Sequence, residues 1–295
     1  MDWDKLRVFH AVAEAGSLTR AGEVLNLSQS AVSRQISNLE ESLDVALFHR
    51  HARGLKLTEQ GELLFRTAHD VFAKLAMAEA RISENRDRPV GPLKINTTVA
   101  FGSVWLTSRI KEFVTLYPDV DVSLVLADTE LDLSMREADA AIRMQPPTQP
   151  DLIQRPLMQL HYHLYASSAY LDEMGTPESV EDLDAHRLVV YGRDASPPVA
   201  NLNWALNIGA EESPRRPALQ VNSIYGIFRA VQSGLGIAAL PDYMSREVGN
   251  LVRVLPDIDG PTVDAYFVYP EELRDTKRIN VLRDFLVSKV KAEEF

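Results

Sequence analysis

The chain contains no cysteine among its 295 residues. Disulfide bonds, thiolate metal ligands, cysteine nucleophiles and thiol redox sensors are therefore excluded. No run approaches the ~18 apolar residues of a membrane-spanning helix, and the acidic, amphipathic start does not have the pattern of a signal peptide. We therefore expect a cytoplasmic protein.

The common catalytic motifs are also missing. No G-x-S-x-G, H-E-x-x-H or G-x-x-x-x-G-K-[ST] pattern occurs, and Gly234-Leu-Gly236 ends a predicted helix instead of opening one. His161 and His163 share one strand face, but two histidines without a carboxylate or cysteine nearby make a poor zinc site. We expect no catalytic residue, no metal and no cofactor.

Residues 17–43 carry the most informative pattern. Ser17 is placed to cap a helix from Leu18 to Leu25, residues 26–27 form a turn, and Ser28 can cap a second helix. In the second helix, apolar residues recur at spacings of four, three and four, which indicates one apolar stripe: Val32, Ile36, Leu39 and Leu43. An earlier helix, roughly residues 4–15, can complete a small three-helix core.

The opposite face of the second helix is polar. Glutamine and arginine can pair bidentately with adenine and guanine edges, and serine supplies adaptable or phosphate contacts. The pattern therefore predicts a helix-turn-helix whose second helix enters the major groove; the alternative is an αα-hairpin with a solvated face. The candidate DNA contacts on this helix are Ser28, Gln29, Ser30, Ser33, Arg34 and Ser37.

The segment 48–58 is basic and contains no acid. Its alternation around Gly54 predicts a β-wing in which Arg50 and Arg53 hold phosphates or reach the minor groove. An ordinary solvated hairpin is the alternative.

The acidic net charge lies outside this N-terminal region. Residues 1–58 hold seven basic and seven acidic side chains, while the rest of the chain holds 24 basic and 35 acidic ones, so the rest carries the whole charge of −11. Positive charge for DNA is therefore local, and binding should depend strongly on salt.

A long helix is predicted from the Thr58 cap to about Asn85. Its apolar residues repeat at alternating spacings of four and three, which indicates a dimer contact, with packing on its own domain as the alternative. These residues are Leu64, Ala68, Val71, Leu75, Ala78 and Ile82. The charged and proline-rich stretch 86–92 then ends the helix and predicts a hinge.

From residue 93 onward, strand and helix patterns alternate. This alternation predicts an α/β fold with parallel-rich sheets covered by helices, and about 200 residues are enough for two such lobes.

At the level of motifs, the whole chain resembles a LysR-type transcriptional regulator. The specific part lies within residues 4–66 and includes Leu6-Arg-Val-Phe9, Ala13-Glu-Ala-Gly16-Ser17-Leu-Thr-Arg-Ala21, Leu27-Ser28-Gln-Ser-Ala-Val-Ser33-Arg34-Gln35-Ile36-Ser37-Asn-Leu39-Glu40, Leu47-Phe48-His-Arg50 and Leu57-Thr58-Glu-Gln-Gly61. Weaker matches follow at Gly91-Pro-Leu93, Phe113-Val-Thr-Leu-Tyr117-Pro118, Ala138-Asp139-Ala-Ala-Ile142-Arg143 and Val231-Gln-Ser-Gly234-Leu-Gly236-Ile237.

The resemblance implies an N-terminal winged helix-turn-helix over residues 1–58 and a dimerising linker helix over 59–88. A two-lobed, periplasmic-binding-protein-like α/β regulatory module would follow, with lobe I formed by 92–161 and 266–295 and lobe II by 162–265. The chain would cross between lobes near 159–163 and 263–266. The resemblance further implies a homodimer or homotetramer that binds an interrupted inverted repeat of double-stranded DNA, with RNA polymerase as a possible partner.

In such a module a small-molecule effector binds between the lobes, at strand ends and helix N-termini. Hydroxyls and N–H groups there favour a carboxylate or another anion. The candidate effector contacts are Thr97, Thr98, Phe101, Ser103, Asp128, Thr129, Tyr191, Asn222, Ser223 and Tyr266. Each hydroxyl has the alternative role of a helix cap, and Arg143 is weighed mainly as a partner of nearby acids.

Two other classes of protein stay open. A solute-binding receptor would need a signal peptide and would have no use for residues 1–58. An α/β enzyme would need a nucleophile or an acid–base pair, and no candidate stands out.

Overall fold

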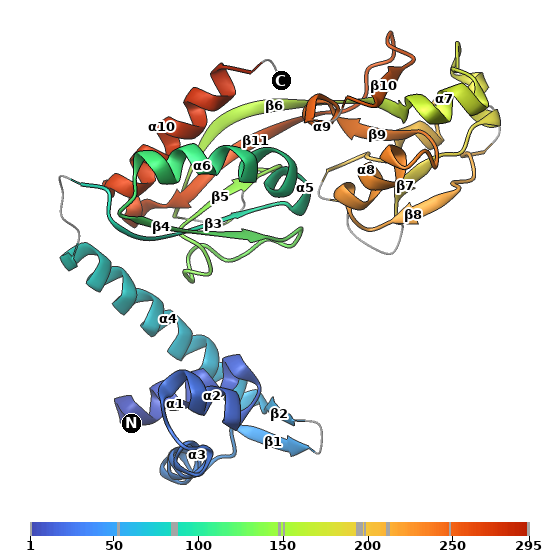
Figure 1. Ribbon diagram of the computed structural model, residues 1–295. Helices are drawn as coiled ribbons and strands as arrows, with labels where there is room; N and C mark the ends of the chain where they lie inside the picture. The colour runs from blue at the N-terminus through green and yellow to red at the C-terminus, as the bar shows by residue number, and fades with distance from the viewer. Residues whose placement is uncertain are drawn as a thin grey trace. The chain divides into compact units, whose positions relative to one another are not determined.

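The computed structural model describes residues 2–51, 54–83, 88–146, 149, 151–192, 197, 199–210, 213–247 and 249–293. The chain divides into two compact units, residues 1–83 and 84–295, each of which is described by itself (Figure 1). Among the described helices, none is long and apolar enough to cross a membrane.

Three short helices open the N-terminal unit. They are α1 (Trp3–Ala15), α2 (Leu18–Leu25) and α3 (Gln29–Leu43). The predicted caps are confirmed, because the Ser17 hydroxyl accepts a hydrogen bond from the Arg20 N–H and the Ser28 hydroxyl accepts one from the Ala31 N–H. The turn between α2 and α3 is tight because Asn26 adopts a left-handed conformation with φ of 54°.

The apolar stripe of α3 is buried except at its end. Val32, Ile36 and Leu39 are at most 2% exposed, whereas Leu43 is 37% exposed. Leu43 therefore belongs to the apolar stripe but lies outside its buried part. The helix stops at Leu43, and Asp44 turns left-handed, so this last turn extends past the three-helix core.

A two-stranded wing follows the third helix. Strands β1 (Phe48–His51) and β2 (Gly54–Leu57) pair antiparallel, which confirms the predicted hairpin. The carboxylate of Glu40 on α3 accepts hydrogen bonds from the Leu47 and Phe48 N–H groups at 2.7 and 3.2 Å. Helix α3 therefore positions the base of the wing directly.

The linker helix α4 spans Glu59–Ser83. The Thr58 hydroxyl accepts from the Gly61 N–H at 3.0 Å, as expected of an N-cap. The first part of the predicted heptad seam, Leu64 and Ala68, packs into the core of this unit, whereas Val71 and Leu75 are exposed. Ala78 and Ile82 have no described side chains, so the end of the seam lies outside the described residues.

A seven-stranded mixed sheet organises the C-terminal unit, with strand order β10-β6-β11-β5-β3-β4 and β9 paired to β6. In the first lobe, β3 lies parallel between β4 and β5, while β11 is antiparallel to β5 and β6. The strands are β3 (Gly91–Thr97), β4 (Val120–Leu126), β5 (Ala140–Arg143), β6 (Leu152–Ser167), β9 (Ala238–Pro241), β10 (Leu251–Val254) and β11 (Thr262–Pro270).

Helices cover the first lobe's sheet. The chain after β3 forms α5 (Val99–Phe101), a π-helical turn (Gly102–Leu106) and α6 (Thr107–Leu116), and the C-terminal helix is α10 (Lys277–Lys291) after a 3₁₀ turn (Glu271–Leu273). The rings of Phe113 on α6 and Phe285 on α10 meet edge to face at 5.3 Å, so the two helices share one apolar layer.

The second lobe contains a separate two-stranded sheet. Its parallel pair consists of β7 (Val189–Tyr191) and β8 (Leu219–Val221). Its helices are α7 (Ser168–Met174), α8 (Ile224–Gln232) and α9 (Asp242–Glu247), with 3₁₀ turns at Glu181–Ala185 and Trp204–Leu206. Ser223 caps α8 through a hydrogen bond from the Gly226 N–H.

The first connection between the lobes is one continuous strand. β6 pairs with β11 as far as His161 and with β9 from Tyr162, so the crossing lies within the expected range 159–163. The second crossing comes before β11, which begins at Thr262. The expected range 263–266 falls inside this strand. The chain returns to the first lobe close to Gly260. Its backbone is tightly packed there, because a Cβ atom would overlap the Tyr162 carbonyl oxygen and crowd Trp204.

We expect Gly61→Ala to destabilise the N-terminal unit by about 1–3 kcal/mol, because an added methyl group would overlap the Leu47 carbonyl oxygen at the base of the wing. Urea unfolding followed by circular dichroism measures the change. Gly249→Ala is the matched control, since nothing lies within 4 Å of its added Cβ. Equal stability of the two variants would contradict the tight packing at Gly61.

Candidate DNA-binding surface and effector cavity

Helix α3 presents the predicted polar face to solvent. Gln29, Arg34 and Ser37 are exposed, and Ser33 is half-buried. The hydroxyls of Ser28 and Ser30 lie 3.1 Å apart, beside the first turn of the helix. Within the part of the chain that the structure describes, Gln29 and Arg34 form no hydrogen bond or ion pair, so both side chains are free to pair with another molecule.

The wing is only partly visible. Arg53 lies outside the described residues, and the side chain of Arg50 is not described either. Among the lysine and arginine side chains of this hairpin, the structure describes that of Lys56 on β2, which is exposed. The two arginine predictions therefore stay predictions.

In the C-terminal unit, a cavity of about 250 Å³ opens at the carboxyl ends of β3, β4 and β5. Four of the ten predicted effector contacts line it: Thr97, Thr98, Asp128 and Thr129. The remaining lining residues are Asn96, Ala127, Glu130, Ile142, Arg143, Met144, Gln145 and Pro197. Most of these come from the first lobe, with Pro197 contributed by the second.

Several polar groups of this cavity also serve the fold. The Thr97 hydroxyl donates to the Ile142 carbonyl at 3.1 Å, and the Thr98 hydroxyl accepts from the Phe101 N–H at 3.4 Å. The Asp128 carboxylate accepts from the Val99 N–H at 3.0 Å, which fixes the loop after β4 against the start of α5. The capping role proposed as the alternative for Thr98 is thus present, beside its place in the cavity wall.

Arg143 supplies the positive charge of the cavity. Its side chain is only 4% exposed, and its Nη1 lies 2.6 Å from the carboxylate of Glu130, which is 57% exposed. Its Nη2 donates to the Leu131 carbonyl at 2.6 Å, while its Nε has no hydrogen-bond partner among the described residues. A buried guanidinium with one unpaired N–H, whose carboxylate partner faces solvent, is suited to bind an anion.

A second cavity of about 350 Å³ lies next to the first and shares Met144 and Gln145 with it. Tyr266 lines this second cavity, together with Val199, Ala200 and the start of β11. The predicted contact Tyr266 therefore lies in the cavity next to the 250 Å³ one and not in the wall of that cavity.

Five predicted effector residues do not line either of these cavities: Phe101, Ser103, Tyr191, Asn222 and Ser223. Phe101 is fully buried and stacks on Trp105 at 4.8 Å, so it serves the core. Ser103 is exposed, as is Asn222. The Ser223 hydroxyl caps α8.

Tyr191 is tied into the second lobe. The Asn203 side chain bridges its backbone, accepting from its N–H and donating to its carbonyl, both at 2.9 Å. Burial raises the pKa of the Tyr191 phenol, and the negative charge of Asp128 raises it further.

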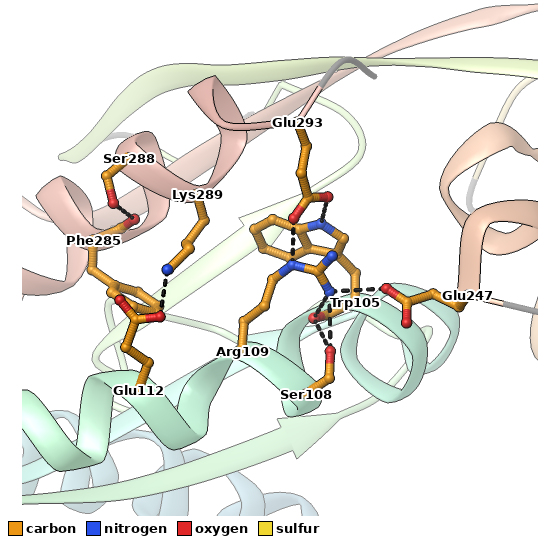
Figure 2. Close-up of polar contacts among 9 residues, drawn as sticks. All are labelled: Trp105, Ser108, Arg109, Glu112, Glu247, Phe285, Ser288, Lys289 and Glu293. Carbon is orange, nitrogen blue, oxygen red and sulfur yellow. Dashed lines mark hydrogen bonds and ion pairs between the residues drawn. The ribbon is translucent and has the colours of Figure 1, made fainter.

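Arg109 joins three elements of the C-terminal unit (Figure 2). Its Nε donates to Glu293, after α10, at 2.6 Å, and its Nη1 donates to Glu247, on α9 of the second lobe, at 3.0 Å. The guanidinium lies 4.7 Å from the centre of the Trp105 ring, whose Nε1 donates to Glu293 at 2.8 Å. We call Trp105, Arg109, Glu247 and Glu293 the interlobe clasp.

The family models identify the chain. The model described as "Bacterial regulatory helix-turn-helix protein, lysR family" matches residues 3–62, and the "LysR substrate binding domain" model matches residues 86–291. The chain therefore belongs to the LysR family of transcriptional regulators. It is a DNA-binding transcriptional regulator with a substrate-binding domain and not an enzyme.

Known proteins agree with this assignment over the whole chain. The regulator CrgA of Neisseria meningitidis serogroup C is 31% identical over 97% of this chain and 96% of its own length. The solved structure of full-length AphB, the Vibrio cholerae virulence activator, is 28% identical with a TM-score of 0.63, covering 98% of this chain and 99% of that chain. The solved structure of CrgA is 29% identical with a TM-score of 0.61, covering 98% of this chain and 99% of that chain.

We expect Arg109→Gln to destabilise the C-terminal unit by about 1–3 kcal/mol, since it leaves two carboxylates of the clasp without their shared cation. Glu112→Gln is the control, because the Glu112–Lys289 pair is more exposed and should contribute under about 1 kcal/mol. Both are measured by urea unfolding followed through tryptophan fluorescence. A larger loss for Glu112→Gln than for Arg109→Gln would refute this ranking.

Proposed function

We propose that α3 reads base edges of an interrupted inverted repeat in double-stranded DNA. The six contacts would be Ser28, Gln29, Ser30, Ser33, Arg34 and Ser37, with Arg50 and Arg53 of the wing on phosphates or in the minor groove. The observation that carries the proposal is that Gln29 and Arg34 are exposed and have no partner among the described residues, on a helix whose other face is buried. Gln29 and Arg34 are the base-reading candidates, and the serines supply phosphate or adaptable contacts.

An inverted repeat requires two copies of the reader, so we propose a homodimer or homotetramer. The exposed Val71 and Leu75 on α4 supply apolar surface for a contact between linker helices. A regulator of this kind acts where its DNA is, which supports a cytoplasmic location in a bacterial cell, with RNA polymerase as a further partner.

For the effector, we propose a small carboxylate bound in the 250 Å³ cavity. The carboxylate would replace the exposed Glu130 on the Arg143 Nη1, while Thr98 and Thr129 offer hydroxyls beside it. Asp128 stands in the same wall and would repel a purely anionic ligand, so the best fit also carries an amino or hydroxyl donor. Binding next to the second lobe would bias the angle between the lobes.

Arg34→Ala should weaken binding to the cognate operator by about 1–3 kcal/mol, because it removes a candidate base contact without touching the core. A fluorescence-anisotropy titration at fixed salt measures this loss. Arg229→Ala is the matched control, since Arg229 is an exposed arginine in the C-terminal unit. If Arg34→Ala and the control bound the operator equally well, Arg34 would not be a base contact.

A thermal-shift screen of small carboxylates against the full chain tests the effector site. Any stabilising compound is then compared with its neutral methyl ester, and with Arg143→Lys and Thr129→Val. We expect the thermal shift to disappear with the ester, which lacks the negative charge. The shift should be smaller in both variants, because Arg143→Lys keeps the charge but loses the planar guanidinium and Thr129→Val removes a hydroxyl. A shift that the ester and both variants retain would place the effector elsewhere.

A further inference from the structure

Three potential metal ligands meet between two helices of the N-terminal unit. His10 and Glu14 are one turn apart on α1, and His69 projects from α4. The His10 Nε2 and His69 Nδ1 atoms lie 2.8 Å apart, and the His10 Nδ1 lies 3.7 Å from the Glu14 carboxylate. One ligand atom from each of the three lies within 4.8 Å of the other two.

The surroundings hold the imidazoles in place. The His10 ring lies 5.3 Å from the ring of Phe65 and 5.1 Å from that of Phe72, both on α4, and 5.0 Å from the ring of His69. Its side chain is only 14% exposed, whereas that of Glu14 is 59% exposed. Two packed imidazoles and one exposed carboxylate therefore lie together near the surface of this unit.

The chemistry of the ligands matches a transition metal. A metal-bound imidazole nitrogen must be unprotonated, and burial lowers the pKa of His10, which favours its neutral form. Two nitrogens on one tetrahedral Zn²⁺ are separated by roughly 3.3 Å, given bonds of ~2.0–2.1 Å. A small rotation of either ring from the observed 2.8 Å therefore makes room for the ion, and the proton shared by the two facing nitrogens moves to the other nitrogen of its ring.

We propose that His10, His69 and Glu14 bind a divalent transition metal of the Zn²⁺ type. His10 Nε2 and His69 Nδ1 are the nitrogen ligands, Glu14 supplies an oxygen, and solvent completes the coordination. Imidazole ligands select Zn²⁺ over Mg²⁺ or Ca²⁺, which prefer oxygen alone.

The bound ion would fasten α1 to α4. Helix α1 carries part of the core on which α3 packs, and α4 is the linker helix, so the metal would hold the DNA reader on its support. The site shares no residue with the polar face of α3 or with the lining of the candidate effector cavity, and it stands independently of the proposed DNA contacts and effector.

The test uses the full chain after treatment with a chelator and dialysis. Zn²⁺ is titrated calorimetrically into the wild type and into His69→Gln, Glu14→Gln and His161→Gln. His161→Gln is the matched control, because His161 lies in the C-terminal unit with Thr262 as its hydrogen-bond partner. Thermal unfolding with Zn²⁺ and with Mg²⁺ follows for each protein, and circular dichroism without metal establishes that each variant is folded.

We expect the wild type and His161→Gln each to bind one Zn²⁺. Zn²⁺ should raise the thermal stability of both proteins, and Mg²⁺ should not. His69→Gln and Glu14→Gln should weaken binding at that site by at least ~10-fold. No binding by the folded wild type would overturn the proposal and leave a hydrogen-bonded histidine pair. Equal binding in the wild type and the folded His69→Gln variant would also overturn it.

Discussion

The burial of one face of α3 is the constraint on which the DNA-binding unit depends. Val32, Ile36 and Leu39 are almost completely removed from water, and this fixes the rotation of the helix about its axis. The polar face, with Gln29 and Arg34, must then point outward. The same helix anchors the wing through Glu40, so a single packing contact sets the direction of both candidate DNA-reading elements.

In the C-terminal unit, a shared strand and an ion pair both connect the two lobes. β6 runs through both lobes without interruption, and Arg109 of the first lobe binds Glu247 of the second. The candidate effector cavity lies at the ends of the first lobe's strands, beside Pro197 of the second. A ligand there would act on a unit whose lobes already share a strand and a charged contact, which favours small changes of lobe angle over wide opening.

Local patterns explain what could be predicted from the sequence. The caps Ser17 and Ser28 and the spacing of the stripe in α3 depend on neighbours within one or two turns, so α2 and the start of α3 fall where the spacing predicts them. Strand ends likewise place Thr98 and Asp128 in one cavity. Phe101 and Ser223 show the limit, because a strand-end position does not say whether a side chain faces a ligand, the core or its own helix. No local signal joins Arg109 to Glu293, since that contact spans 184 residues and depends on how α10 packs on α6.

Selection of duplexes from a random library by the purified full-length protein, at moderate ionic strength, tests the central claim most directly. An outward-facing reading helix in a dimeric protein predicts enrichment of one sequence with two inverted half-sites. It also predicts that the Gln29→Ala, Arg34→Ala double variant enriches a different or degenerate sequence. Failure of the wild type to prefer any duplex over random competitor would contradict the account of α3 as a base-reading helix.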